Sequence, residues 1–267
     1  MKKLLALAMA FVALCCSAAK VDTIALNTKL VPDAPVNAIV ITPTTGQEAY
    51  PTVYLLNGYS GCHNDWYNII QPRLAELSDL YGMVMVMPDG RDSWYWDSPA
   101  VPEMKMESFI TTELVPYIDA NYPTIPQAAK RAITGLSMGG QGGLWLAMRH
   151  PDMFGTGGST SGGVDIRPFP KNWKMAKWLG PEAENQKVWD EHAVINLVPT
   201  VKPGAPNIIF DCGVDDFFYE VNVNLHNALL DAKIPHDFIS RPGNHSREYW
   251  RNSILYQLLY FNEIFNR

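Results

Sequence analysis

Cysteine is scarce in this chain, with four among 267 residues. Two of them, Cys15 and Cys16, fall within the first 19 positions. The remaining Cys62 and Cys212 permit one disulfide at most. Two buried free thiols are the alternative, and we favour it because free cysteine commonly behaves as a small buried apolar residue.

Other features are also missing, and each absence narrows the function. The chain has no run of five basic residues and carries a net charge of −6, so nucleic acids and anionic membranes are poor candidates as partners. Beyond the N-terminus no stretch is apolar and long enough to span a membrane. There is no internal repeat, low-complexity linker or break in composition. With 47% hydrophobic residues, the chain suits one α/β domain over residues 20–267. The sequence is silent on its oligomeric state.

Residues 1–19 have the pattern of a signal peptide. A basic pair, Lys2-Lys3, precedes an apolar run that ends at Cys16, and Ser17-Ala18-Ala19 forms a small-residue cleavage site. A buried N-terminal helix is the alternative interpretation. A lipoprotein is disfavoured, because the residues before the two cysteines, Leu14 and Cys15, fit a lipidation site badly. We therefore expect an exported protein, periplasmic or secreted.

Short apolar runs alternate with segments of helical periodicity along the rest of the chain. This alternation predicts a mostly parallel sheet covered by helices on both faces. A region rich in proline, lysine and tryptophan, residues 164–203, interrupts it and predicts an insertion with short helices. We expect strands at 21–26, 36–41, 52–56, 83–87, 131–134, 155–159, 207–211 and 235–240, and helices at 67–80, 107–120, 141–150, 221–232 and 247–265.

The segment Gly135-Leu136-Ser137-Met138-Gly139 fits the G-x-S-x-G nucleophile elbow. It lies between a predicted strand and a predicted helix, which is the context that the motif requires. At such an elbow the serine takes a strained backbone angle, and the close passage of the chain admits only glycine on either side. Ser137 is therefore the candidate nucleophile, and the amide of Met138 at the helix start is a candidate oxyanion donor.

A serine nucleophile needs a histidine base and a carboxylate that orients it, and in this fold class they follow the serine in the order acid, histidine. Of the five histidines after Ser137, only His245 lies in a predicted strand-to-helix loop. The acid should come from the loop after the strand at 207–211, where Asp215 and Asp216 are available. The pattern alone leaves these two open.

The second oxyanion donor should be a backbone amide in the loop after the strand that ends at Leu56. Gly58 would let the chain approach the substrate closely, and we predict the amide of Tyr59 as the donor. A glycine-rich loop that merely turns is the alternative.

Five motifs together resemble the esterase D-type family, which includes feruloyl and acetylxylan esterases, tributyrin-type esterases, S-formylglutathione hydrolases and, more distantly, mycolyltransferases. They are YLLNGYSGCHNDW, MPDGRDSWYWDSP, GLSMGG, CGVDDFFYE and PGNHSREYW, in order over almost the whole chain.

The resemblance implies an α/β-hydrolase fold with little or no cap. By motif it implies Ser137 as nucleophile, His245 as base and Asp216 as acid, with the amides of Tyr59 and Met138 as oxyanion donors. Asn57 departs from the family, where many members have histidine, so local packing of that loop is expected to differ.

Other candidates carry weaker signals. Trp94, Tyr95 and Trp96 could form an aromatic wall for an acyl group or sugar, or could be exposed packing residues. His63 and Asp65 lack a third ligand and make a poor metal site. We expect no metal and no cofactor.

The combined prediction is an exported serine esterase that acts through an acyl-enzyme, on acetyl or feruloyl esters of plant polysaccharides. An acyltransferase, an S-formylglutathione-hydrolase-like thioesterase and a non-catalytic carbohydrate-binding relative are the alternatives. Export argues against the thioesterase, because its substrate is cytosolic.

Overall fold

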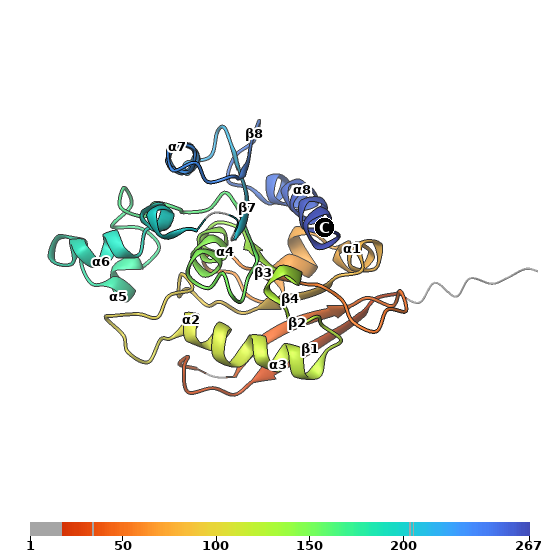
Figure 1. Ribbon diagram of the computed structural model, residues 1–267. Coiled ribbons are helices and arrows are strands. Elements are labelled where there is room, and N and C mark those ends of the chain that lie inside the picture. Colours follow the sequence, from red (N-terminus) through yellow and green to blue (C-terminus); the bar gives the residue numbers. More distant parts are fainter. Residues whose placement is uncertain (1–17, 34, 203, 205) are drawn as a thin grey trace, which may run out of the picture.

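The computed structural model describes residues 18–267 except 34, 203 and 205. The predicted signal segment, residues 1–19, therefore lies almost entirely outside the described part. Eight strands form one sheet in the order β1-β2-β4-β3-β5-β6-β7-β8 (Figure 1). Only β2 runs antiparallel to its neighbours, and all other pairs are parallel. The strands are β1 (Lys20–Leu26), β2 (Val36–Thr42), β3 (Thr52–Leu56), β4 (Val84–Pro88), β5 (Arg131–Gly135), β6 (Thr156–Thr160), β7 (Asn207–Gly213) and β8 (Asp237–Arg241).

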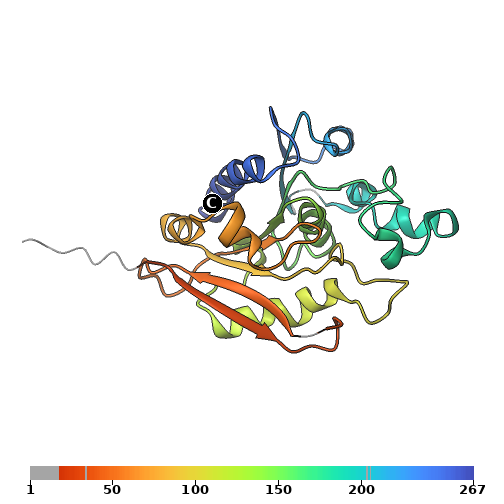
Figure 2. The same cartoon turned by 180° about the vertical axis from the view of Figure 1, so that it is seen from behind.

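The central strands are buried on both faces, which explains their continuous apolar runs. In β3, Tyr54 and Leu56 belong to one hydrophobic cluster, while Val53 and Leu55 belong to a second cluster on the opposite face. Helices α1 (Leu74–Tyr81) and α8 (Arg247–Phe265) cover the face of the second cluster, and they lie side by side in both views (Figures 1 and 2).

The other face is covered by α2 (Met106–Ser108), α3 (Val115–Asn121), α4 (Met138–Arg149) and α7 (Tyr219–Asp231). The insertion also packs on this face. It contains α5 (Met175–Leu179), α6 (Gln186–Glu191) and two short 3₁₀ segments, η4 (Glu182–Glu184) and η5 (Val194–Thr200). A third 3₁₀ segment, η3 (Ala128–Lys130), precedes β5. The predicted α/β class, with an irregular insertion of short helices, is thus confirmed.

Two predicted helices differ from the structure, and proline is involved in both. The helix expected at 67–80 is two pieces, the π-helical turn η1 (Asp65–Ile70) and then α1. Pro72 explains the break, because a residue before proline avoids the helical region and Gln71 has φ −134° and ψ 82°.

The helix expected at 107–120 is continuous, but its middle part, η2 (Phe109–Leu114), is π-helical. Pro116 follows directly at the start of α3 and has no amide hydrogen to donate to the preceding turn. The helical path therefore changes its hydrogen-bond pattern there, and the Val115 amide reaches back to the carbonyl of Ile110.

Candidate active site

The turn between β5 and α4 is the sharpest feature of the sheet edge. Ser137 has φ 56° and ψ −117°, a backbone region that residues other than glycine rarely adopt. A Cβ atom on Gly139 would lie 2.3 Å from the carbonyl oxygen of Leu56, and one on Gly135 would lie 2.6 Å from the same oxygen. The two glycines of the motif are therefore required because β3 passes directly beside the elbow.

Three loops at the carboxyl ends of parallel strands bring Ser137, Asp216 and His245 together. Ser137 follows β5, Asp216 follows β7 and His245 follows β8. His245 Nε2 lies 2.9 Å from Ser137 Oγ. On the other side of the ring, His245 Nδ1 lies 2.8 Å and 3.1 Å from the two carboxylate oxygens of Asp216.

These distances determine the tautomer of the neutral imidazole. A carboxylate only accepts hydrogen bonds, so Nδ1 must carry the hydrogen that it donates to Asp216. Nε2 then presents its lone pair to the hydroxyl of Ser137. This arrangement is the one in which a serine can transfer its proton to a histidine as it attacks.

The structure separates the two candidate acids. The side chain of Asp216 is fully buried, whereas Asp215 is exposed. The Asp215 amide donates to the carbonyl of Gly243 at 2.9 Å, and a Cβ on Gly213 would lie 2.3 Å from that same carbonyl oxygen. The loop after β7, which carries both acids, therefore packs closely against the loop after β8, which carries His245. This contact leaves Asp215 outside and Asp216 facing His245.

Aromatic rings surround the imidazole. The ring centroids of Phe217 and His245 are 4.3 Å apart, and Trp250 meets His245 edge-on at 4.9 Å. Only 17% of the His245 side chain is exposed. The rings shield the His245–Asp216 pair from water, which strengthens the hydrogen bond between them.

The two predicted oxyanion amides come from the elbow itself and from the loop after β3. Met138 is the first residue of α4, where an amide hydrogen has no acceptor within the helix. Tyr59 lies in the loop after β3 and lines the same cavity as Ser137 and His245. Its neighbour Gly58 lies against the elbow, since a Cβ there would be 2.6 Å from the side chain of Leu136. Beside this loop, buried Asn57 accepts hydrogen bonds from the Gly90 amide and the Tyr95 hydroxyl, so it is a structural residue here.

Ser137 and His245 border a cavity of about 600 Å³. Three aromatic side chains that the sequence analysis did not select, Trp173, Phe217 and Trp250, line it. Phe217 and Trp250 lie within the acid and base motifs, so their sequence position was a usable signal. Trp173 comes from the irregular insertion, where no sequence signal pointed to it. Tyr59, Asp65 and Arg247 provide polar groups around the same cavity.

The predicted aromatic wall of Trp94, Tyr95 and Trp96 is wrong. All three side chains are at most 1% exposed and none of them lines this cavity. Trp94 and Trp96 stack on each other, and the Tyr95 hydroxyl donates to the carbonyl oxygen of Asn57. All three belong to the hydrophobic core, so the alternative of exposed packing is wrong as well.

Neither remaining cysteine is in a disulfide, in agreement with the favoured alternative, although Cys62 is only partly buried. Burial raises the pKa of the Cys212 thiol. Within the described part of the chain, no three side chains of histidine, cysteine, aspartate or glutamate gather as a metal site. The part that the structure describes also contains no helix with the length and apolar character of a membrane span.

The four other histidines that follow Ser137 in the chain have partners elsewhere in the fold. His150 Nε2 is 2.7 Å from Glu107, His192 stacks on Trp145, and His226 and His236 are hydrogen-bonded to each other. His245 is the histidine that the structure places beside the elbow.

The sheet order, the strained serine between β5 and α4 and the neighbouring histidine define the α/β-hydrolase class. Residues 32–261 match the model of the family described as "Putative esterase". The chain belongs to this esterase family and is a serine esterase.

Its relatives span several ester chemistries. The chain is 28% identical to an acetyl esterase of Caldicellulosiruptor saccharolyticus over 78% of this chain and 81% of that protein. It is 26% identical to mouse S-formylglutathione hydrolase, over 77% and 80% of the two chains. A solved ferulic acid esterase superposes with a TM-score of 0.79 at 27% identity, over 92% of this chain and 98% of that one.

Proposed function

We propose that this protein is an exported carboxyl-ester hydrolase that uses Ser137, Asp216 and His245 as a catalytic triad. The main support is the pair of contacts made by the imidazole of His245. Its Nε2 lies 2.9 Å from Ser137 Oγ, and its Nδ1 lies 2.8 Å from the Asp216 carboxylate. The proposed substrates are acetyl or feruloyl esters of plant polysaccharides.

In the first half-reaction, Ser137 Oγ attacks the ester carbonyl carbon while His245 Nε2 takes the hydroxyl proton. The carbonyl oxygen becomes an oxyanion, to which the amides of Met138 and Tyr59 donate hydrogen bonds. The bond between the acyl carbon and the alcohol oxygen then breaks, and His245 returns its proton to the departing alcohol. The acyl group stays on Ser137.

In the second half-reaction, water attacks the acyl-enzyme and His245 takes a proton from it. Collapse of the second tetrahedral intermediate releases the carboxylic acid, and the proton returns to Ser137. Asp216 keeps the imidazole in the required tautomer and stabilises its positive charge during both steps.

The substrate proposal is supported by the cavity and by the relatives. A planar aromatic acyl group could pack against Trp173 or Phe217, whose rings stack at 5.6 Å with an angle of 24°. The acetyl esterase and the ferulic acid esterase are named for the two acyl groups in question. Export is proposed from residues 1–19, whose basic, apolar and small-residue regions follow one another as in a signal peptide.

The test compares hydrolysis of p-nitrophenyl acetate and methyl ferulate by the mature protein and by Ser137→Ala. We expect both esters to be cleaved, and the variant to lose on the order of 10³-fold or more in kcat. An equally active variant, or a wild-type protein that cleaves neither ester, would refute the proposal.

A further inference from the structure

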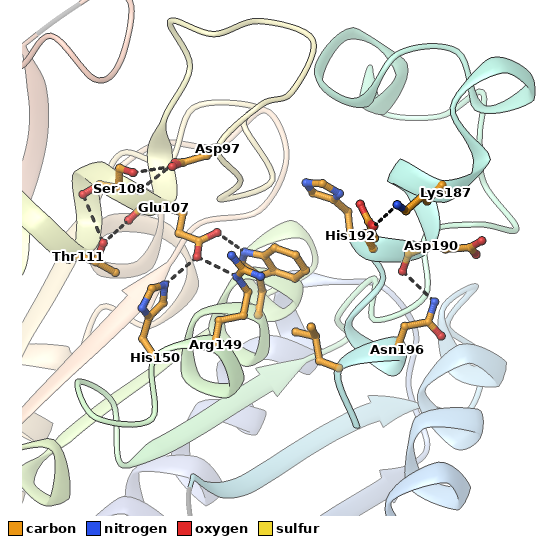
Figure 3. Close-up of a pocket in the computed structure, with 13 residues that line it drawn as sticks. Asp97, Glu107, Ser108, Thr111, Arg149, His150, Lys187, Asp190, His192 and Asn196 are labelled. Atoms are coloured by element: carbon orange, nitrogen blue, oxygen red, sulfur yellow. Dashed lines mark hydrogen bonds and ion pairs between the residues drawn. The ribbon is translucent and has the colours of Figure 1, made fainter. Parts of the chain in front are cut away.

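A second cavity, of about 640 Å³, lies away from Ser137. Figure 3 shows side chains from three parts of the chain around it, which are the segment from Asp97 to Thr111, the end of α4 and the insertion around α6. Trp145 lies eight residues beyond Ser137 on α4, which corresponds to roughly 12 Å along the helix axis. The insertion also supplies Trp173 to the catalytic cavity, so it borders both.

The carboxylates on the α2 side of this cavity are already held by donors. Glu107 accepts hydrogen bonds from Trp145 Nε1 at 2.8 Å, Arg149 Nε at 2.9 Å and His150 Nε2 at 2.7 Å (Figure 3). Asp97 accepts from the amide and the hydroxyl of Ser108. Because the carboxylates of Glu107 and Asp97 already accept these hydrogen bonds, they have little remaining capacity to bind a cation.

Other polar atoms at the cavity remain available. His192 Nδ1 lies 2.7 Å from the carbonyl oxygen of Val188, which only accepts, so Nδ1 carries the hydrogen. Burial lowers the pKa of His192, which keeps the ring neutral and leaves the Nε2 lone pair as an acceptor. Arg149 uses Nε on Glu107, so its terminal nitrogens are donors that this bond does not use, and the side chain is 44% exposed.

The charges around the cavity disfavour an anionic ligand. Four carboxylates line it, against one arginine, one lysine and two histidines. Acids therefore outnumber the permanent cations, and a phosphate or a uronate would meet net repulsion. A neutral polyhydroxylated molecule fits better, because each hydroxyl group both donates and accepts a hydrogen bond.

We propose that this second cavity binds neutral sugar residues, with Arg149 donating to and His192 Nε2 accepting from their hydroxyl groups. The inference rests on the proposed polysaccharide substrate, whose backbone would be held here while an ester on the same polymer reaches Ser137. A volume of about 640 Å³ is within the range of about 300–1,000 Å³ that is usual for ligand pockets.

The first experiment measures binding without chemistry. The Ser137→Ala protein is titrated with xylohexaose, which carries no ester, by isothermal titration calorimetry. We expect saturable binding that weakens by about tenfold or more in Arg149→Met/His192→Phe, because both hydrogen-bonding groups are lost while the stacked stem and ring remain. An acidic oligogalacturonate should not bind.

His226→Phe is the matched control, because it removes a histidine that also stacks on an aromatic ring but lies outside both cavities. If the double variant does not fold, Asn196→Leu replaces it, since this exposed residue also lines the cavity. The inference is overturned if xylohexaose does not bind, if neither variant weakens its binding, or if oligogalacturonate binds as well as xylohexaose.

The second experiment separates this inference from the proposed function. With Ser137 restored, the double variant should hydrolyse p-nitrophenyl acetate at the wild-type rate but require a higher concentration of feruloylated arabinoxylan for half-maximal rate. A failure of the esterase proposal would leave the xylohexaose titration unchanged. Equal kinetics of variant and wild type on the polymer would overturn the inference even if the esterase proposal holds.

Discussion

The two cavities have similar volumes, about 600 Å³ and 640 Å³, but they use their carboxylates in different ways. In the cavity beside Ser137, buried Asp216 holds one nitrogen of His245 and leaves the other facing the hydroxyl of Ser137. In the second cavity, Glu107 accepts three hydrogen bonds and no nucleophile lies at the end of the network. The proposed chemical role therefore distinguishes the two acid–histidine pairs by what faces the histidine's other nitrogen, which is a serine hydroxyl only in the first cavity.

The largest effect should come from Asp216→Asn. The amide can no longer hold His245 in the tautomer that accepts the serine proton, so kcat for p-nitrophenyl acetate should fall on the order of 10⁴-fold. The neighbouring Asp215→Asn is the control and should stay near wild type, because its side chain is exposed. Similar losses in the two variants would contradict the assignment of the acid.

Glu107→Gln should affect stability without affecting chemistry. Burial alone would raise the pKa of Glu107, but hydrogen bonds from His150, Arg149 and Trp145 outweigh it and hold the pKa below its ordinary value. The carboxylate therefore stabilises the fold above its unfolded pKa, and this contribution is lost as the pH falls through the lower folded value.

At pH 7 the free energy of unfolding of Glu107→Gln should decrease by about 1–3 kcal/mol in urea titrations. Its rate on p-nitrophenyl acetate should be unchanged. Glu76→Gln provides the surface comparison, because the Arg73–Glu76 pair is about two-thirds exposed and should change stability by less than about 1 kcal/mol. A large loss of esterase activity in Glu107→Gln would break the distinction between the two cavities.

Trp173→Leu should alter the choice of acyl group. Loss of the indole face beside Phe217 should lower kcat/KM for methyl ferulate by up to about tenfold, the value of one aromatic contact. The acetyl ester is too small to use that face and should change less. Tyr117→Leu, an exposed aromatic residue on α3, should leave the ratio of the two substrates unchanged. An equal loss on both esters would show that Trp173 supports the fold rather than the acyl group.

The smallest expected effect concerns pH. Burial lowers the pKa of His192 from its ordinary value of 6.5, so the unfolded chain binds a proton there more readily than the folded protein. Stability from this residue is present above pH 6.5 and declines as the pH falls from that value towards the folded pKa. His192→Phe should therefore lose less stability than wild type between pH 6.5 and pH 5 in thermal unfolding. A steeper loss in the variant would contradict the neutral state of His192.

Much of the fold could be predicted because its signals are local. Apolar runs, glycines and prolines gave every strand and most helices to within a few residues. The elbow was recognisable because the close passage of β3 forces glycine at fixed positions. The helix break at Pro72 was missed, although the restriction that proline places on Gln71 is also local.

Residues whose role depends on burial were harder to predict. The motif MPDGRDSWYWDSP indicated an exposed aromatic loop, yet Trp94 and Tyr95 take left-handed backbone angles with φ 57° and 63° that fold the loop inward. Trp173 lines the cavity beside Ser137 although it comes from a segment without periodicity. Nothing in the order of residues indicates that Glu107 and His192 border the same cavity, because they come from segments far apart in the chain.

The sequence by itself determined the α/β class, the nucleophile elbow and the order of serine, acid and histidine, because these depend on short-range backbone constraints and on the succession of strands. The tertiary structure shows the physical reason why Asp216, the acid that the family resemblance implied, faces the imidazole, since the amide of its neighbour Asp215 is hydrogen-bonded to the carbonyl of Gly243. It also decided that Trp94, Tyr95 and Trp96 are core, and that a second polar cavity exists. The burial of a side chain and the lining of a cavity depend on which distant segments meet in the folded chain, so they cannot be predicted from local sequence.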